Sequence, residues 1–305
     1  MAKTSHSHTH DARNDDILIS IDGKLFHRNE AKVSVFDSAF MLGDGVWEGL
    51  RVHHGTIAFC DLHINRLYAG AKALDFHPGI EKDALKQRIL DTVQANDMHD
   101  GVHIRLMVSR GTKSTPYQDP RVTITPPTIV IIPEYKEALP ESVSEGVSLF
   151  TAHVRRGFPD VQDPKLNSHS KINCILACIQ ATKAGADEAL MLDPHGFVAT
   201  CNSTHFFIVK DGCVMTSTGQ FCIDGVTRGA ILRICKEQGI EHSECQFSLS
   251  DVYSADESFI TGTFAGVVPV TSVDGREIGS GARGAMVVKL QDYYKALLEQ
   301  ECAGG

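Results

Sequence analysis

The sequence predicts an α+β fold divided into two domains. The chain has 305 residues, which is more than one small core usually serves. Strand and helix patterns follow one another in mixed order, without the regular alternation of a doubly wound nucleotide-binding fold. The segment PEYKEALPES (133–142) contains two prolines and mixed charge, which is typical of a linker, and we place the linker at 134–142. We therefore expect a polar tail over 1–15, a small domain over 16–133 and a larger domain over 143–305.

In the first domain, ILISIDGKLF (17–26) places two apolar runs around Asp22-Gly23, a strong hairpin signal. The strand pattern continues through VSVFDSAFML (33–42) and through 47–59, with a turn at His54-Gly55. The spacing of apolar residues then predicts helices over 61–76 and 81–96, followed by strands over 102–110 and 128–135.

The second domain opens with a strand over 147–156, followed by an irregular stretch over 157–170. An amphipathic helix is expected over 171–184, because Gly185 follows it as a C-cap residue. The remaining expected elements are strands over 188–193 and 205–210, a turn at Asp211-Gly212, a helix over 227–238, a strand over 257–263, a turn at Asp274-Gly275 and a helix over 284–300.

Charge and composition exclude several classes of function. The 29 basic and 38 acidic residues leave a net charge of −9, which argues against nucleic acid as the main partner. No run approaches the ~18 apolar residues of a membrane-spanning helix. The N-terminus lacks the apolar centre of a signal peptide; its His6, His8 and His10 could chelate a metal, but a disordered tail fits so polar a segment better. The nine cysteines are scattered and include no C-x-x-C pair, so we expect a reduced, cytoplasmic protein without a metal site.

The common short catalytic motifs do not account for the chain. Residues 279–284 match G-x-G-x-x-G, but they lie too near the C-terminus for a strand–helix–strand unit, so we expect a loop. No G-x-x-x-x-G-K-[ST], G-x-S-x-G or H-E-x-x-H motif occurs. This removes the usual signatures of phosphoryl transfer, serine hydrolysis and zinc proteolysis.

Five blocks in order resemble the fold-type IV, pyridoxal-phosphate-dependent aminotransferases, also called aminotransferase class IV. They are VSVFDSAFMLGDGVWEGLRV with HINRL (33–67), IRLMVSRG (104–111), ILACIQATKAGADEALMLD (175–193), GVTRGAIL (225–232) and DESFITGTFAGVVPV (256–270). The second block is similar to the branched-chain amino acid aminotransferases. The resemblance implies a small N-terminal α/β domain, a larger C-terminal domain with a mixed sheet that binds the cofactor, and pyridoxal 5'-phosphate as that cofactor.

The same resemblance implies which residues hold the cofactor's phosphate. Arg51 would supply a charge-assisted contact. The backbone N–H groups of Val226 and Thr227 would add the favourable end of a helix dipole. Gly262 and Thr263 would supply the remaining contacts to the phosphate. Considered alone, Arg51 is more simply a surface arginine, and Val226 and Thr227 an ordinary helix start. The shared order of the five blocks favours the cofactor site instead.

The chain departs from the family at the lysine that forms an imine with the cofactor. Counting without gaps from VRR (154–156) and from ILACIQA (175–181) places that lysine at Asn167. Asparagine cannot form an imine. Lys165 lies two residues earlier in a stretch expected to be extended, so its side chain could point the same way. Lys171 lies four residues later and shares the face if the helix has begun there. We favour Lys171 as the catalytic residue and keep Lys165, and the absence of any imine-forming lysine, as alternatives.

A second departure concerns the acid that the family places beside the pyridine nitrogen, where this chain has Thr200. A neutral threonine accepts or donates a hydrogen bond but cannot hold the ring proton by charge. The resemblance still puts Thr200 and Ser203 among the cofactor contacts. This puts the reaction type in doubt more than cofactor binding.

Substrate contacts are implied for Trp47, Arg105 and Phe264. Trp47 replaces the family's usual Phe or Tyr, and Arg105 matches an arginine of the branched-chain enzymes. The arginine and histidine that hold the carboxylate in D-amino acid aminotransferases are replaced by Thr115 and Tyr117.

We therefore expect transamination of an apolar, branched-chain-like amino acid with a 2-oxo acid acceptor. A D-amino acid or (R)-amine transaminase and an aminodeoxychorismate lyase-type enzyme are the alternatives within the superfamily. The rival from another class is a catalytically impaired cofactor-binding or interaction protein, motivated by Asn167 and Thr200. The apolar segment FMLGDGVWEGL (40–50) and the resemblance together predict a homodimer at least.

Overall fold

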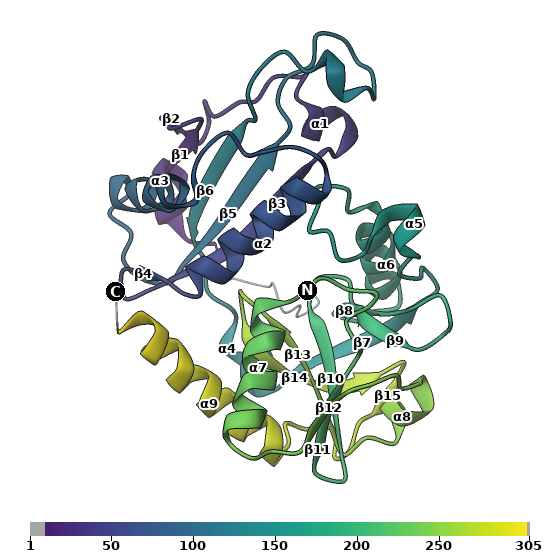
Figure 1. The fold of residues 1–305 in the computed structure, drawn as a ribbon. Coiled ribbons are helices and arrows are strands. Elements are labelled where there is room, and N and C mark those ends of the chain that lie inside the picture. The colour runs from purple at the N-terminus through teal and green to yellow at the C-terminus, as the bar shows by residue number, and fades with distance from the viewer. Residues whose placement is uncertain (1–9, 304–305) are drawn as a thin grey trace. The chain divides into compact units, whose positions relative to one another are not determined.

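The computed structural model describes residues 10–303, and these form two compact units. The N-terminal unit comprises residues 10–137 together with Leu166–Lys171 and residues 301–303. The C-terminal unit comprises residues 138–165 and 172–300. Both units combine a sheet with helices, which confirms the predicted α+β class (Figure 1).

The N-terminal unit is built on an antiparallel sheet of six strands in the order β2-β1-β6-β5-β3-β4. The hairpins at Asp22-Gly23 and His54-Gly55 are confirmed, and all four turn residues have positive φ, as tight hairpins of this kind require. The strands are β1 (Leu18–Ile21), β2 (Lys24–His27), β3 (Gly45–His53), β4 (Thr56–Ile57), β5 (Val102–Ser109) and β6 (Ile129–Tyr135).

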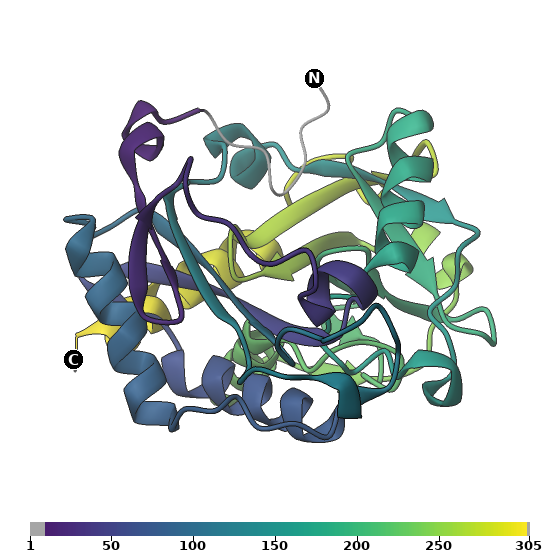
Figure 2. The ribbon, with the colours of Figure 1, turned by 90° about the horizontal axis from the view of Figure 1, so that it is seen from above.

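The helices α2 (Cys60–Ala73) and α3 (Lys82–Ala95) cover one face of this sheet, where α2 packs on β3 and α3 packs on β1 and β6 (Figures 1 and 2). Their apolar stripes meet the inward-facing residues of the strands, and side chains such as Leu50 and Ile64 are fully buried between them. Burial alternates along β3, so every second residue of that strand faces the opposite side. The unit also contains the 3-10 turns η1 (Ala12–Asp16) and η2 (Pro120–Val122).

The strand predicted over 33–42 is wrong. Residues Ser38–Leu42 form a short helix, α1, and the preceding residues have no regular structure. The side chain of Asp37 accepts a hydrogen bond from the backbone N–H of Ala39, so it caps the helix, and Gly43 ends it in the left-handed conformation. The alternation of Val33 and Val35 imitates a strand, but these two side chains are exposed.

The C-terminal unit is built on a mixed sheet of nine strands in the order β12-β11-β10-β13-β14-β7-β8-β9, with β15 paired to β14. Strand β7 runs parallel to β8 and β14, and β11 runs parallel to β12; the other pairs are antiparallel. The strands are β7 (Val147–Ala152), β8 (Glu188–Leu192), β9 (Val198–Cys201), β10 (His205–Lys210), β11 (Cys213–Thr216), β12 (His242–Glu244), β13 (Glu257–Gly262), β14 (Gly266–Val273) and β15 (Arg276–Glu277).

Helices of the C-terminal unit confirm the main sequence predictions. The predicted helices over 171–184, 227–238 and 284–300 correspond to α6 (Ile172–Lys183), α7 (Val226–Glu237) and α9 (Ala285–Cys302). Helix α6 packs on β7 and β8, and α7 packs on β13. Three shorter helices complete the unit: α4 (Pro140–Ser144), α5 (Pro159–Gln162) and α8 (Leu249–Tyr253). The G-x-G-x-x-G match at 279–284 lies in the loop between β15 and α9, as predicted.

The boundaries of the units differ from the expected ones in detail. The first nine residues of the expected tail, with His6 and His8, lie outside the described residues, whereas η1 covers its last four residues and continues to Asp16. The division between the units falls between Glu137 and Ala138, inside the expected linker. Residues 166–171 pack with the N-terminal unit, although the sequence places them in the larger domain. Within residues 10–303, no helix combines the length and apolar character needed to cross a membrane.

Candidate active site

The C-terminal unit presents an open helix start where the sequence predicts a phosphate site. Helix α7 begins at Val226, and its N-cap, Gly225, provides no side-chain hydrogen bond to the first turn. The first N–H groups of a helix have no partner within the helix, so an uncapped start favours an anion. The predicted residue Thr227 lies in this first turn and is buried.

The imidazole of His205 connects this helix start to the end of β13. A Cβ atom built on Gly225 would lie 2.3 Å from Cε1 of His205, so the ring and the Gly225 backbone are in close contact. His205 is also the cross-strand partner of Thr261, and Gly262 follows. The structure therefore brings the predicted residues Val226 and Thr227 close to the strand end that carries Gly262 and Thr263.

A small cavity next to this strand end is lined by Thr261, Gly262 and the predicted substrate contact Phe264. Phe264 is buried, whereas Thr263 is half-buried. The Thr261 hydroxyl is buried and has no hydrogen-bond partner among the described residues. A buried hydroxyl without a partner is unfavourable, and a bound polar group would satisfy it.

Thr200 and Ser203 are engaged in hydrogen bonds within the unit. The Thr200 hydroxyl on β9 is buried and donates to the backbone carbonyl of Thr204 at 2.8 Å. The Ser203 hydroxyl is exposed and donates to the carboxylate of Glu188 at 2.7 Å. Glu188 is buried and also accepts from the Thr204 hydroxyl, so it is a structural anchor of this turn that the sequence analysis did not identify.

In the N-terminal unit, three predicted residues lie on one face of the sheet. Trp47 and Arg51 are at alternating positions of β3, and both belong to its less buried face. Arg105 on β5 pairs with Gly49, which lies between them on the same face. This is the face opposite to the one that α2 and α3 cover.

Arg105 and Trp47 form a stacked pair. The guanidinium carbon of Arg105 lies 3.8 Å from the centroid of the Trp47 ring, which is favourable for a cation over an indole face. Burial lowers the pKa of Arg105 from its ordinary value, and the nearby Glu134 and Glu48 carboxylates oppose that shift. An arginine remains charged all the same, so it presents a cation on a face that also carries the Trp47 ring.

Asn167 takes part in backbone pairing along the edge of β3. Its backbone carbonyl accepts from the N–H of Trp47, and its side-chain amide donates to the carbonyl of Trp47 at 2.6 Å. Ser168 pairs with Val46 in an antiparallel bridge and accepts the indole N–H of Trp47 on its carbonyl at 3.0 Å. Asn167 is buried, and its side-chain oxygen has no hydrogen-bond partner among the described residues. The position therefore has a structural role in this chain.

The two candidate lysines have different surroundings. Lys171 is half-buried and directly precedes α6; its Nζ atom lies 5.5 Å from the centroid of the Trp47 ring. Lys165 is exposed in a turn after α5, where its backbone N–H is bonded to the Asp163 carboxylate. The stretch around Lys165 was expected to be extended, and the turn is a correction to that expectation.

Arg228, in the first turn of α7, is buried. It donates to the backbone carbonyl of Ser217 and forms an ion pair with Glu244.

Comparison with known proteins decides the family. The family model described as "Amino-transferase class IV" matches residues 45–273. The chain belongs to the class IV aminotransferases. Members of this family are pyridoxal-phosphate-dependent transferases.

Relatives of this aminotransferase chain include a protein named "Putative branched-chain-amino-acid aminotransferase" from Methanocaldococcus jannaschii. It is 39% identical over 278 residues, which cover 91% of this chain and 95% of that protein. The "Branched-chain-amino-acid aminotransferase-like protein 1" of Arabidopsis thaliana is 37% identical over 94% of this chain but only 51% of its own length. The chain thus spans about half the length of the plant relatives that it matches.

Among solved structures, a T.th. branched-chain amino acid aminotransferase with pyridoxamine 5'-phosphate is similar to this class IV chain. The TM-score is 0.88 at 30% identity, covering 94% of this chain and 95% of that one. The predicted fold, with a small N-terminal antiparallel sheet and a larger mixed sheet, is confirmed by this likeness.

Proposed function

We propose that the chain catalyses transamination: it moves the amino group of an amino acid to a 2-oxo acid while pyridoxal 5'-phosphate is bound. Family membership and relatives named as branched-chain aminotransferases support this proposal. The observation that carries it in this chain is the amine of Lys171 beside the stacked Trp47 and Arg105.

The described residues fit the phosphate end of the cofactor. The start of α7 offers N–H groups of Val226 and Thr227 that no side chain caps. Gly225 has no room for a side chain because His205 fills that space. The unpartnered hydroxyl of Thr261 is a further donor beside Gly262. We assign these groups, with Arg51 and Thr263, to the phosphate; a dianion suits N–H groups, hydroxyls and a guanidinium.

When bound, the cofactor supplies an electron-accepting ring that eases removal of the Cα proton from the amino acid. We assign two tasks to Lys171: covalent attachment of the cofactor, and transfer of the proton that leaves Cα. An amine suits both tasks when its surroundings favour the neutral form. Asn167 has no amine, and exposed Lys165 is the alternative that the mutants below test.

Thr200 would present a neutral hydroxyl to the pyridine nitrogen of the cofactor. The proton of the Thr200 hydroxyl is donated to Thr204, which leaves the oxygen lone pairs to accept a bond. The nearby Glu188 carboxylate already accepts bonds from Ser203 and Thr204. Less electron withdrawal by the ring would follow, so we expect slower proton removal than in enzymes with an acid there.

For the substrates, we propose that Arg105 binds the carboxylate of the amino acid and that Trp47 and Phe264 contact its side chain. Met107 and Val130 lie on the same face of the N-terminal sheet as Trp47, which suits apolar, branched-chain-like donors. 2-Oxoglutarate is the proposed acceptor.

We also propose that the chain is at least a homodimer. Large apolar side chains around α1 are exposed in the described chain, among them Val35 (66%) and Phe40 (69%). So dense an apolar segment is typical of a protein interface. Light scattering should give at least twice the chain mass of 33.2 kDa, and a monomer mass at working concentration would refute this proposal.

The test of the proposed function combines absorbance with an assay. Purified protein with added cofactor should show the visible band of a lysine-bound cofactor and should transaminate an L-amino acid. Lys171→Ala should lose both, and Lys165→Ala should keep both. A protein that stays colourless with added cofactor would instead support the rival hypothesis of a catalytically impaired cofactor-binding or interaction protein, which Asn167 and Thr200 motivate. Matched D-amino acids and (R)-amines tell the alternatives within the superfamily apart.

A further inference from the structure

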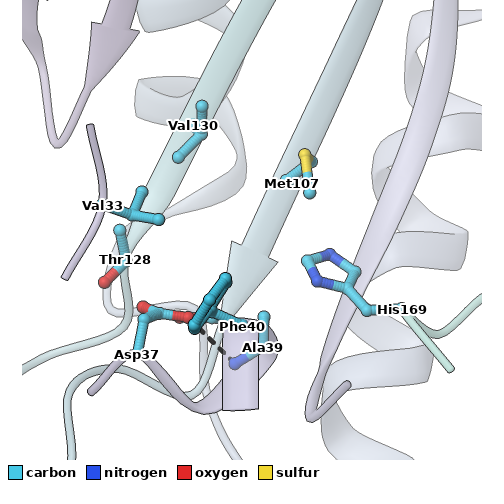
Figure 3. Close-up of a pocket in the computed structure, with 9 residues that line it drawn as sticks. Val33, Asp37, Ala39, Phe40, Met107, Thr128, Val130 and His169 are labelled. Atoms are coloured by element: carbon cyan, nitrogen blue, oxygen red, sulfur yellow. Dashed lines mark hydrogen bonds between the residues drawn. The ribbon is translucent and has the colours of Figure 1, made fainter. Parts of the chain in front are cut away.

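A pocket in the N-terminal unit lies beside the Trp47 face and has a buried carboxylate at one end. Its volume is about 190 Å³. Figure 3 shows Asp37, Ala39 and Phe40 at the α1 end, Met107 and Val130 on the two strands, and His169 across from Val33. The walls are mostly apolar, and the polar groups are those of Asp37, Ser109, Thr128 and His169.

Two residues of the pocket wall are neighbours of the proposed substrate residues. Met107 on its wall is the cross-strand partner of Trp47. His169 on its other wall lies two residues before Lys171 and is bonded to the edge of β3 through Val46. An amino acid held between Arg105 and Lys171 could therefore extend its side chain over Met107 into the pocket.

Asp37 carries an uncompensated charge at the inner end. It is only 3% exposed. Its carboxylate accepts the N–H of Ala39 at 2.9 Å and the hydroxyl of Ser109 at 2.7 Å. Among the residues that the structure describes, no lysine or arginine forms an ion pair with it; Lys113, whose backbone is bonded to Phe36, directs its ammonium to the carbonyl of Asp119.

The imidazole of His169 does not replace the missing cation. Burial lowers the pKa of His169 from its ordinary value, and the positive charges of Arg105 and Lys171 lower it further, against the bond to Val46 and the attraction of Asp37. These surroundings favour the neutral form of the ring. A buried carboxylate without a cation is unfavourable, and a ligand cation would relieve this.

We propose that this pocket binds the side chain of an amino donor whose aliphatic chain ends in a primary ammonium group, with Asp37 as the partner of that ammonium. The proposal rests on the transamination proposed above and names a donor class beyond the branched-chain amino acids. The carboxylate of Asp37 favours an ammonium over a methyl end, because its oxygens accept hydrogen bonds while most of the other wall groups are apolar.

The distance along β5 matches such a chain. Met107 and Ser109 lie on the same face of the strand, one step of roughly 7 Å apart. An extended lysine side chain spans a similar length. A lysine side chain whose Cα lies level with Trp47 and Met107 would therefore bring its ammonium level with Ser109, whose hydroxyl is bonded to Asp37.

The first experiment compares donors in the wild-type protein with cofactor bound. L-Lysine and L-norleucine share an aliphatic chain and differ in the terminal ammonium, and 6-hydroxy-L-norleucine adds a neutral donor. We expect kcat/KM for L-lysine to exceed that for both others at least about tenfold, since a charge-assisted bond to a carboxylate is being gained. The oxo product of L-lysine should keep its terminal amine. Equal values, or a preference for L-norleucine, would overturn the proposal without any mutant.

A second experiment measures binding without α-transamination. Calorimetric titration of the same protein with 6-aminohexanoate and with hexanoate compares two carboxylates that lack an α-amino group. We expect the amine to bind at least about tenfold more tightly. If it does so while no amino acid is transaminated, the proposed function fails and the pocket stands. If L-norleucine is transaminated but the two carboxylates bind equally, the pocket proposal fails and the function stands.

The matched variants are Asp37→Asn and Asp119→Asn. The one side-chain oxygen of asparagine still caps the helix at Ala39, and its NH2 group, in place of the second oxygen, can donate to the Ser109 hydroxyl, so Asp37→Asn removes the charge with little change in shape. Its ratio of L-lysine to L-norleucine kcat/KM should fall at least about tenfold. Asp119→Asn removes a carboxylate from another cap that does not line the pocket, and its ratio should equal that of the wild type. A ratio that does not change in Asp37→Asn would show that the ammonium is recognised elsewhere.

Discussion

The side-chain amide of Asn167 donates a hydrogen bond of 2.6 Å to the backbone carbonyl of Trp47. This bond, with the reciprocal backbone bond from the N–H of Trp47, ties the segment before α6 to the edge of β3. Asn167 thus holds the strand that presents Trp47. Lys171 at the end of the same segment is held over the Trp47 ring as a consequence.

Asn167→Ala should lower the free energy of unfolding by about 1–2 kcal/mol, because the Trp47 carbonyl loses its partner from a buried amide. Chemical denaturation followed by fluorescence of Trp47, the one tryptophan of the chain, measures this change directly. Asn65→Ala, on the exposed surface of α2, serves as the control and should change the value by less than about 0.5 kcal/mol. Equal effects of the two substitutions would contradict the structural role of Asn167.

Stability of the N-terminal unit should depend on pH through Glu48. This fully buried carboxylate lies 2.7 Å from Nδ1 of His63 and accepts two bonds from Arg66. Burial raises the pKa of Glu48, but the bonds from His63 and Arg66 outweigh burial and lower it below its ordinary value of 4.5. A lowered pKa means that the stabilisation is fully present above about pH 4.5 and is lost as the pH falls through the lower, folded-state value.

Glu48→Gln should therefore cost about 3 kcal/mol at neutral pH, because it leaves the Arg66 and His63 groups without their anion. Urea denaturation at several pH values should show the wild type approaching the variant as the pH falls below 4.5. Glu30→Gln changes an exposed carboxylate and should show neither effect. A constant difference between wild type and Glu48→Gln at all pH values would refute this account.

Gly225 and Gly229, at the start of α7, allow a matched test of the proposed phosphate site. Gly225→Ala should raise the Kd for pyridoxal 5'-phosphate about tenfold and destabilise the fold by about 1–3 kcal/mol, because its Cβ meets the His205 ring. Gly229→Ala, one turn later and with nothing within 4 Å of its Cβ, should raise stability by about 0.5–1 kcal/mol. Cofactor titration and thermal unfolding measure both. An unchanged affinity of Gly225→Ala for pyridoxal 5'-phosphate would show that the start of α7 does not bind the cofactor.

Local signals in the sequence were enough for much of the fold. The hairpins at Asp22-Gly23 and His54-Gly55 were predictable because the turn residues themselves require positive φ. The error over 33–42 arose because Val33 and Val35 alternate like a strand, whereas the helix that forms there begins at the Asp37 cap. The separate strands β9 and β14 were not identified, since their burial depends on neighbours distant in the chain.

The sequence predicted which residues belong to the site but not how they are arranged in space. Alternation along β3 places Trp47 and Arg51 on one face, but the register that brings Arg105 over Trp47 is a long-range property of the sheet. The pairing of residues 166–171 with β3 crosses more than a hundred positions of sequence, so nothing local indicates it. The buried carboxylate of Asp37 was missed for the same reason, because its hydroxyl partner is Ser109.

The most direct test of the central claim is to find the residue that carries the cofactor. The protein saturated with pyridoxal 5'-phosphate is reduced with borohydride, digested and mapped by mass spectrometry. The account predicts the phosphopyridoxyl label on Lys171, together with loss of the visible band, and no label after Lys171→Ala. A label on Lys165 or on any other lysine, with Lys171 unmodified, would contradict it.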